Sequence, residues 1–292
     1  MDAPGIALRF ALFLDLLLLV GLAAFAWRGG DAGRGRRSRA MLAVLAGSGI
    51  VLSVAGLVAL AAAMAGVPVT QVDRATIGML LTGTAVGTAW IVRIVALVAA
   101  MLLARRPGAA GVASAVALAT LAWSGHGAMD TGPRGLVHLV ADIGHLFAAA
   151  GWLGTLAALL FLLARRPEAS RVAVTHDALA SFAGVGTLLV ALVVATGVVN
   201  GWLLLGWPVW SQLAGSTYGR LLLAKIALFA AMLVLAGVNR FRLTPALAAQ
   251  AADPRGAWRA LRRSVAIESG CGVAVVALVA WLGTLEPPVV AG

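Results

Sequence analysis

The residues with the clearest chemical potential are three ionisable side chains within one long apolar segment. His138, Asp142 and His145 lie in the first half of the segment that runs from Arg134 to Leu163. Their spacing of four and then three residues places all three on one face of an α-helix. Ionisable groups are costly inside a bilayer, where they mark ion paths, proton relays or ligand sites. The segment therefore predicts a site for a metal ion or for protons.

Two further ligand candidates precede this segment, in the sequence SGHGAM. His126 supplies a third imidazole, and Met129 supplies a thioether. Imidazole together with thioether suits a soft or borderline metal ion, copper above all. We therefore predict that His126, His138, His145 and Met129 contribute to a metal site. The spacing leaves open whether the histidines bind one ion or form successive sites along an entry path.

Charged side chains in two other apolar segments are candidates for supporting roles. Asp15, Arg220 and Lys225, together with Asp142, can orient a ligand or balance the charge of a bound ion. A charge buried in a helix bundle persists only when it is paired. We therefore expect a carboxylate partner for Lys225, either Asp15 or Asp142.

The polar residues of the apolar segments also admit a purely structural interpretation. The stripe of three ionisable residues can be a satisfied hydrogen-bond network between helices, and Met129 can be an apolar loop residue. Thr196 and Asn200 are interpreted as polar contacts that join helices. Arg93 and Glu268 are interpreted as structural ion-pair partners.

The composition is that of a membrane protein. Hydrophobic residues make up 62% of the 292-residue chain, and the mean hydropathy is +1.00. Apolar segments of about 20 residues are long enough to cross the hydrocarbon core. We predict an all-α polytopic membrane protein, a bundle of about eight transmembrane helices in a single domain over 1–292. The expected spans are 6–27, 41–65, 84–104, 110–126, 137–163, 179–205, 219–239 and 265–284.

Three smaller features complete the expected architecture. The first span carries Arg9 and Asp15 and lacks a convincing cleavage site, so it is interpreted as a retained span and not a signal peptide. The stretch 67–83 is expected to hold an interfacial helix. Cys271 is the single cysteine, which excludes an intrachain disulfide.

The net charge of +11 reflects membrane topology and gives no reason to expect a nucleic-acid partner. Arginines gather in four alternate loops between the expected spans, at 28–39, 105–106, 165–171 and 240–263. By the positive-inside rule these loops are cytoplasmic, so both termini face the periplasm. The candidate metal site then lies in the outer leaflet, whereas Glu268 lies in the inner half of the bilayer.

Several stretches of the chain share a family pattern. They are ATGVVNGWLLLG and STYGRLLLAKIALFAAMLVLAGVNRFRLTPAL within 195–247, WSGHGAM, HLVADIGHLFAAAGWLGTL, TGTAVGTAWIVR and LRRSVAIESGCGVAVVALVAWLGTLEPP. The run Thr-Tyr-Gly-Arg-Leu-Leu-Leu-Ala-Lys and the ending Asn-Arg-x-x-Leu-x-Pro are the most specific. These stretches resemble the CopD family of bacterial copper-resistance membrane proteins, which includes PcoD. The resemblance covers most of the chain and is strongest over 120–285.

The resemblance implies an inner-membrane protein of copper homeostasis and resistance that moves copper from the periplasm toward the cytoplasm. It implies a copper ion as the bound species and a periplasmic copper-binding protein of the CopC type as partner, beside the lipid bilayer. No catalytic residues are expected. The chain has no P-loop and no hydrolytic constellation, so we do not expect an enzyme.

Two other functions remain compatible with the residues. A b-type cytochrome would hold a single outer-leaflet haem b between two of His126, His138 and His145. No histidine is expected within the inner half of the bilayer, which argues against a cytochrome with two haems. A third possibility is a helix-bundle assembly factor whose polar residues only organise packing.

Overall fold

Helices form all the regular structure of the described residues, which confirms the all-α class. The computed structural model describes residues 3–29, 35–124, 132–165, 167, 169–205, 213, 215–249 and 253–286. In chain order, the elements are α1 (Ala3–Arg28), α3 (Arg36–Ala65), η1 (Val69–Gln71), α4 (Arg74–Gly83), α5 (Ala85–Leu102), α6 (Pro107–Ala119), η2 (Thr120–Ser124), α7 (Gly132–Leu163), α8 (Ala169–Leu205), α10 (Thr217–Val238), the π-helical turn η4 (Asn239–Leu243), α11 (Thr244–Ala249) and α12 (Arg255–Leu282).

Seven helices in the described part of the chain are long and apolar enough to cross a membrane. The remaining expected span, 110–126, corresponds to the shorter apolar helix Pro107–Trp123, formed by α6 and η2. A 3₁₀ turn rises about 2.0 Å per residue against about 1.5 Å in an α-helix, so η2 extends this helix further than its residue count indicates. Over its described residues, each of the eight expected spans therefore coincides with helix, and the protein is a multi-pass membrane protein.

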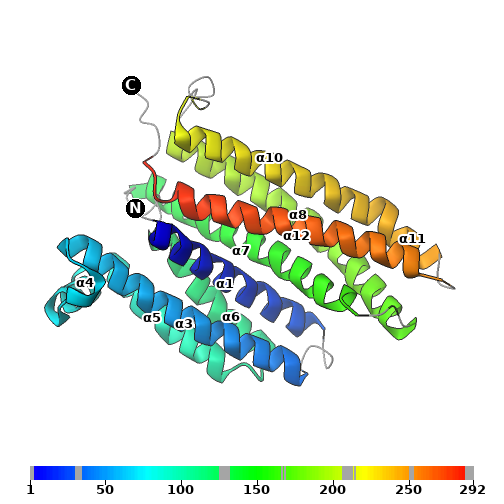
Figure 1. Cartoon of the computed structure of the whole chain (residues 1–292), viewed down its shortest axis with the longest axis horizontal. Helices are drawn as coiled ribbons and strands as arrows, with labels where there is room; N and C mark the ends of the chain where they lie inside the picture. Colours follow the sequence, from blue (N-terminus) through cyan, green and yellow to red (C-terminus); the bar gives the residue numbers. More distant parts are fainter. Residues whose placement is uncertain are drawn as a thin grey trace.

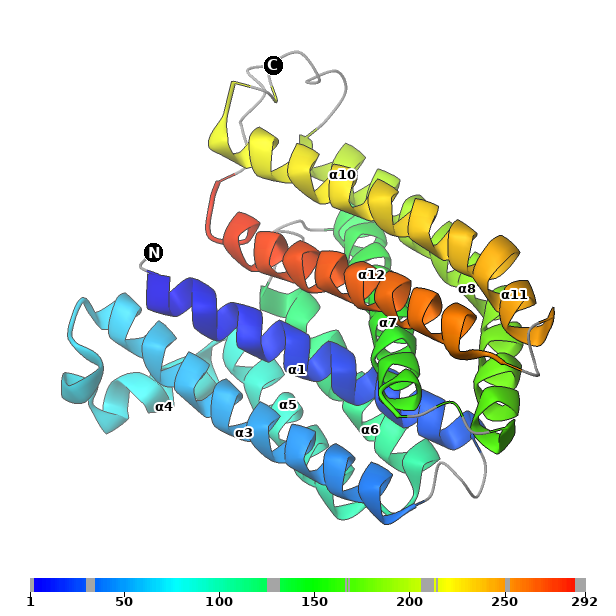
Figure 2. The same cartoon turned by 45° about the vertical axis from the view of Figure 1, so that its right-hand side comes forward.

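The bundle consists of two groups of helices that meet at α1. The helices lie side by side along a common direction, with α3, α5 and α6 on one side of α1 and α8, α10 and α12 toward the other (Figure 1). The first helix packs against α3, α6, α7 and α12, as the turned view in Figure 2 also shows. The N-terminal helix is therefore the central element, although it is the first to be made.

The two ends of the bundle differ in charge. Four loops are rich in arginine, and the helix ends that flank them lie together in Figure 1, for example the end of α1 and the start of α12. We call this end of the bundle the arginine-rich end. The start of α1, the end of α12 and α4 lie at the opposite end. The predicted topology depends on this difference in charge between the two ends.

The helix expected within 67–83 is α4, and it begins at a capping carboxylate. The backbone N–H of Thr76 donates to Asp73 Oδ1 over 2.7 Å. This hydrogen bond holds the pKa of Asp73 below its usual value, because it stabilises the ionised form.

Two glycines allow α1 and α7 to touch through their backbones. A Cβ at Gly21 would overlap the Ala150 carbonyl, and a Cβ at Gly154 would overlap the backbone of Gly21. Small residues at such crossings allow close packing between membrane helices, where dispersion contacts replace the hydrophobic effect. This crossing fixes α7, which carries the candidate ligands, against the centre of the bundle.

Arg93 is buried at the middle of α5 with neutral partners, in contrast to the ion pair expected for it. The side chain is 1% exposed. Its Nε donates to Thr120 Oγ1 over 2.7 Å, its second terminal nitrogen donates to the Thr120 carbonyl over 3.3 Å, and its guanidinium lies 5.1 Å from the ring centre of Trp90. Among the described residues, no ion pair joins Arg93 to Glu268, whose carboxyl oxygens accept from Trp152 and Asn239 instead. Arg93 thus fastens η2, just before His126, to α5.

Candidate functional site

A polar cavity lies toward the end of the bundle opposite the arginine-rich end. Its volume is about 240 Å³, and residues of α1, η2, α7, α8, α10 and α12 line it. The polar and charged side chains among them are Arg9, His138, Asp142, His145, Asn200, Tyr218 and Lys225. All three members of the predicted α7 stripe therefore line one cavity.

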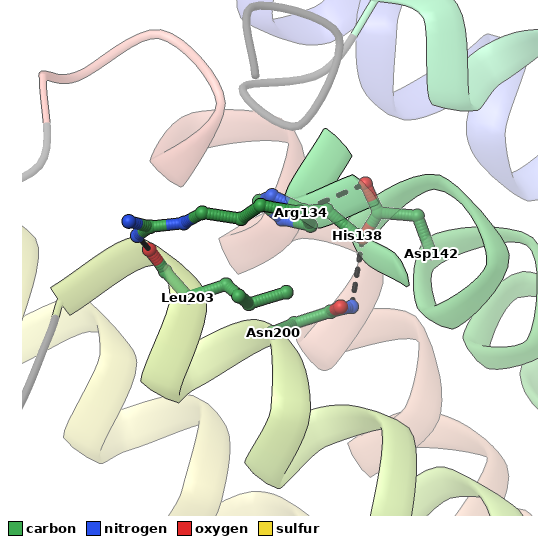
Figure 3. A network of polar contacts seen from close by, with 5 residues as sticks. All are labelled: Arg134, His138, Asp142, Asn200 and Leu203. Atoms are coloured by element: carbon green, nitrogen blue, oxygen red, sulfur yellow. Dashed lines mark hydrogen bonds and ion pairs between the residues drawn. The ribbon is translucent and has the colours of Figure 1, made fainter. Parts of the chain in front are cut away.

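Among the residues that line this cavity, His138, Asp142 and Asn200 form a chain of polar contacts between α7 and α8 (Figure 3). His138 is 3% exposed, and its Nε2 lies 4.0 Å from Asp142 Oδ2. Asn200 Nδ2 donates to Asp142 Oδ1 over 2.7 Å. Within the described part of the chain, Asn200 Oδ1 is buried and has no hydrogen-bond partner. A buried unpaired oxygen beside a carboxylate is a feature that a bound cation would satisfy.

Further along α7, one hydroxyl sets the tautomer of His145. His145 Nδ1 lies 2.9 Å from Thr196 Oγ1, and the Thr196 hydroxyl donates its own proton to the Leu192 carbonyl over 2.6 Å. Because that proton is committed, Oγ1 accepts from Nδ1–H, and Nε2 of the neutral imidazole keeps its lone pair. Histidines that bind metals commonly have their second ring nitrogen held in this way.

Backbone carbonyls brace the rim of the same cavity. Arg134 donates to the Leu203 carbonyl over 2.7 Å, which ties the start of α7 to the end of α8 (Figure 3). Arg9 donates from Nη1 to the Gly283 carbonyl over 3.2 Å, which ties the start of α1 to the residue that follows α12. Arginine supplies these contacts because its guanidinium reaches far and presents several donors.

The charged residues predicted to support the site divide into two groups. Lys225 lines the cavity with Asp142, and each charge acts on the other. Among the described residues, no ion pair within 4.0 Å includes Lys225. Asp15 lies elsewhere, at the α1–α3 contact, where Ser48 donates to it over 2.5 Å. Arg220 is exposed, and its terminal nitrogen lies 3.4 Å from Thr217 Oγ1.

The predicted ligand set is only partly within the described residues. His126 and Met129 lie outside them, so their convergence with His138 and His145 stays a prediction. Leu121 of η2 lines the cavity, which places the segment leading to His126 at its wall. Within the described ranges, no three side chains of His, Cys, Asp or Glu lie close enough together to hold one metal ion.

A second, larger cavity adjoins the first and shares lining residues with it. Its volume is about 410 Å³, and its lining is mostly apolar. His145 and Lys225 line both cavities and so stand where the two meet. Trp152, Phe229 and Met232 line the deeper part.

Sequence reasoning missed several of these lining residues. Tyr218 and Arg9 were not expected to share a site with the histidines, because nothing in the sequence places their helices around α7. Trp152 carried a usable signal, because it follows His145 by seven residues, as His145 follows His138, and so shares their helical face.

Comparisons with known proteins agree with this architecture. Residues 1–136 match the model of the copper resistance protein D-like N-terminal domain, and residues 176–282 match that of copper resistance protein D. A copper resistance protein D of Pseudomonas syringae pv. tomato is 43% identical, with 100% of this chain and 99% of that protein aligned. The inner membrane protein YebZ of Escherichia coli (strain K12) is 28% identical, with 97% and 98% aligned.

No solved structure is detectably similar to the chain. The two matched regions account for most of its length, and the relative from Pseudomonas aligns from end to end. The chain belongs to the copper resistance protein D family and is a multi-pass protein of the inner membrane.

Proposed function

We propose that this protein carries copper from the periplasm toward the cytoplasm through the two adjoining cavities. The orientation follows from the positive-inside rule, which places the arginine-rich end in the cytoplasm. The polar cavity then opens toward the periplasmic half of the membrane. Copper is the cargo because the chain belongs to a copper-resistance family and because imidazole ligands suit that ion.

The observation that carries the proposal is the shared lining of the polar cavity by His138, Asp142 and His145. Ionisable side chains are costly to bury in a membrane bundle, and they persist there where they face a wet cavity or a ligand. The neutral imidazole of His145 has one nitrogen held by Thr196 and the other available to a cation. The unpaired Asn200 Oδ1 adds a neutral oxygen to the same wall.

Successive stations fit the geometry better than a single compact centre. His138 and Asp142 lie together, whereas His145 lies one to two turns further along α7 and borders both cavities. A cation would first meet the carboxylate–imidazole pair and then His145. Lys225 lines the same two cavities as His145. Its positive charge would repel a cation bound at His145, and this favours passage over tight storage.

A periplasmic copper-binding protein of the CopC type is the partner that this route requires. Free copper is scarce beside a membrane, and a carrier would deliver the ion at the mouth of the polar cavity. The stretch 125–131, which includes His126 and Met129, joins η2, whose Leu121 and Ala122 line the polar cavity, to α7.

Copper uptake by proteoliposomes tests the proposal. Wild type, His145→Ala and His176→Ala are reconstituted in parallel, Cu(I) is added outside, and internal copper is measured after removal of external ions. We expect wild-type uptake from His176→Ala, because His176 lies on α8 beside Asp177, outside both cavities. Uptake by His145→Ala should fall about 10–100-fold, the usual effect of losing one ligand.

Equal uptake by wild type and His145→Ala would reject the route. An absorption spectrum of the same preparation distinguishes the cytochrome alternative, since bound haem b would give a Soret band. Such a band, lost in His145→Ala, would replace copper transfer by haem binding as the function of the cavity.

A further inference from the structure

A third polar cluster lies deeper in the bundle, where Glu268 of α12 meets α7 and the π-helical turn η4. The Glu268 side chain is 2% exposed. Trp152 Nε1–H donates to Glu268 Oε1 over 2.8 Å, and Asn239 Nδ2–H donates to Glu268 Oε2 over 2.9 Å. Glu268 follows Arg263 by five residues, about 8 Å along the helix axis, so the cluster lies in the half of the bundle nearer the arginine-rich end.

Both hydrogen-bond donors to this carboxyl are neutral. Over the described ranges, no ion pair joins Glu268 to a lysine, arginine or histidine. The charged or titratable residues on the elements packed against α12 make other contacts or lie elsewhere on those elements. They are Arg9, Asp15 and Arg28 on α1, Arg134, His138, Asp142 and His145 on α7, Tyr218, Arg220 and Lys225 on α10, and Arg240 and Arg242 on η4. The arginines of α12 itself, at positions 255, 259, 262 and 263, are exposed.

A buried carboxylate without a cation is costly, and a carboxyl in such a place keeps its proton. The Asn239 carboxamide accommodates either state. In the described structure its Nδ2 donates to Glu268, while its buried Oδ1 has no hydrogen-bond partner among the described residues. A half-turn of the carboxamide would present Oδ1 as the acceptor for a protonated carboxyl without breaking another bond.

The backbone at this position is also unusual. Asn239 begins the π-helical turn Asn239–Leu243, and the Thr244 hydroxyl donates to the Asn239 carbonyl over 2.8 Å. Such turns are rare and frequently occur at functional sites. Here the turn directs a carboxamide from the end of α10 toward α12.

Trp152 connects this cluster to the path proposed above. It lines the apolar cavity together with Phe229, whose ring centre lies 5.7 Å away, and Met232. Its indole N–H faces the other way, toward Glu268. The carboxyl therefore lies directly behind the side chain at the deep end of the cavity.

We propose that Glu268 is a proton-binding site at the inner end of the path, neutral while the path is empty and ionised when a cation passes Trp152. The Oε–H bond breaks, the proton leaves to water on the cytoplasmic side, and the carboxylate charge stabilises the cation. The proton returns once the cation has left. The role of the passing cation rests on the proposed function, whereas the neutral state of the empty protein does not.

Infrared difference spectroscopy on the full-length protein in proteoliposomes tests both the neutral state and its coupling to the cation. At neutral pH and without copper, wild type should show a buried carboxylic acid C=O band that Glu268→Gln lacks. Glu286→Gln, which changes an exposed carboxyl, should keep the band. Trp152→Phe removes the indole N–H donor together with part of the ring and should shift the band, which gives a second readout if Glu268→Gln fails to assemble.

Addition of Cu(I) should then remove the band in wild type and release protons, detected by a pH dye inside the vesicles. Identical spectra from wild type and Glu268→Gln at neutral pH would overturn the assignment. A band that persists during measured copper uptake would overturn the coupling. A protein that shows the band but moves no copper would refute the proposed function and leave the proton site standing.

Discussion

The hydroxyl of Thr196 determines which ring nitrogen of His145 is available to a ligand. Thr196 accepts from Nδ1 of His145 because its own proton is committed to the Leu192 carbonyl. The imidazole therefore presents Nε2, and no other tautomer preserves both hydrogen bonds. Asn200 has a comparable role about a turn further along α8, where its Nδ2 donates to Asp142. The two residues interpreted as contacts between helices are thus also the residues that orient the candidate ligands.

Replacement of Thr196 by valine should weaken copper binding without removing a ligand. The change keeps the shape of the side chain but leaves Nδ1–H of His145 without its acceptor, so the ring is no longer held. We expect copper affinity to fall about 10-fold, as measured by competition with a chromophoric chelator. Thr82→Val, which changes an exposed threonine of α4, is the matched control. Equal affinities for the two variants would show that Thr196 does not position the ring.

The sequence predicted the α7 stripe correctly but not all of its neighbours. Helical periodicity fixes which residues share a face, and His138, Asp142 and His145 do line one cavity. Periodicity does not reveal which helix lies opposite that face. Asp15 accordingly lies against Ser48, and Arg220 is exposed, although both share the depth expected for the site.

At the scale of helices, the contact between α1 and α7 holds the ligand-bearing helix in place. Gly21 and Gly154 meet with no room for a Cβ on either side. The sequence contains 35 glycines, and their number indicated close packing without identifying the pair that touches. Only the crossing of two helices far apart in the sequence distinguishes these glycines from the others.

Gly154→Ala should therefore destabilise the protein although alanine favours helix. The added methyl group overlaps the backbone of Gly21, and overpacking of this kind costs about 1–3 kcal/mol. Thermal unfolding in detergent, followed by circular dichroism, measures the loss. Gly237→Ala in α10 is the control, because a Cβ there has no neighbour within 4 Å. A lower melting temperature in the control than in Gly154→Ala would contradict the packing argument.

At the scale of the whole molecule, the arginine-rich loops and the polar cavity are separated along the length of the bundle. The loops rich in arginine belong to one end, and the polar cavity lies toward the other. Composition and span length were sufficient to predict the membrane class and the helices. The two adjoining cavities were beyond sequence reasoning, because their walls combine side chains from five or more helices.

Reporter fusions check this orientation directly. Fusions after Arg37 and after Arg166 should report a cytoplasmic location, and a fusion after Pro133 a periplasmic one. Paired reporters, one active only in the cytoplasm and one only in the periplasm, give opposite signals at each site. A cytoplasmic signal at Pro133 would place the histidine stripe on the wrong side and exclude copper entry from the periplasm.

The hydrogen bond from Arg9 to the Gly283 carbonyl has a consequence for biogenesis. The two residues are 274 positions apart, so the ribosome has delivered α12 before the first helix can complete this rim contact. The first helix is synthesised long before this partner, so its partly buried arginine lacks the Gly283 carbonyl until α12 has been made. The rim of the polar cavity is therefore completed only after α12 has been synthesised, so assembly of the proposed copper site depends on the last membrane helix of the described chain.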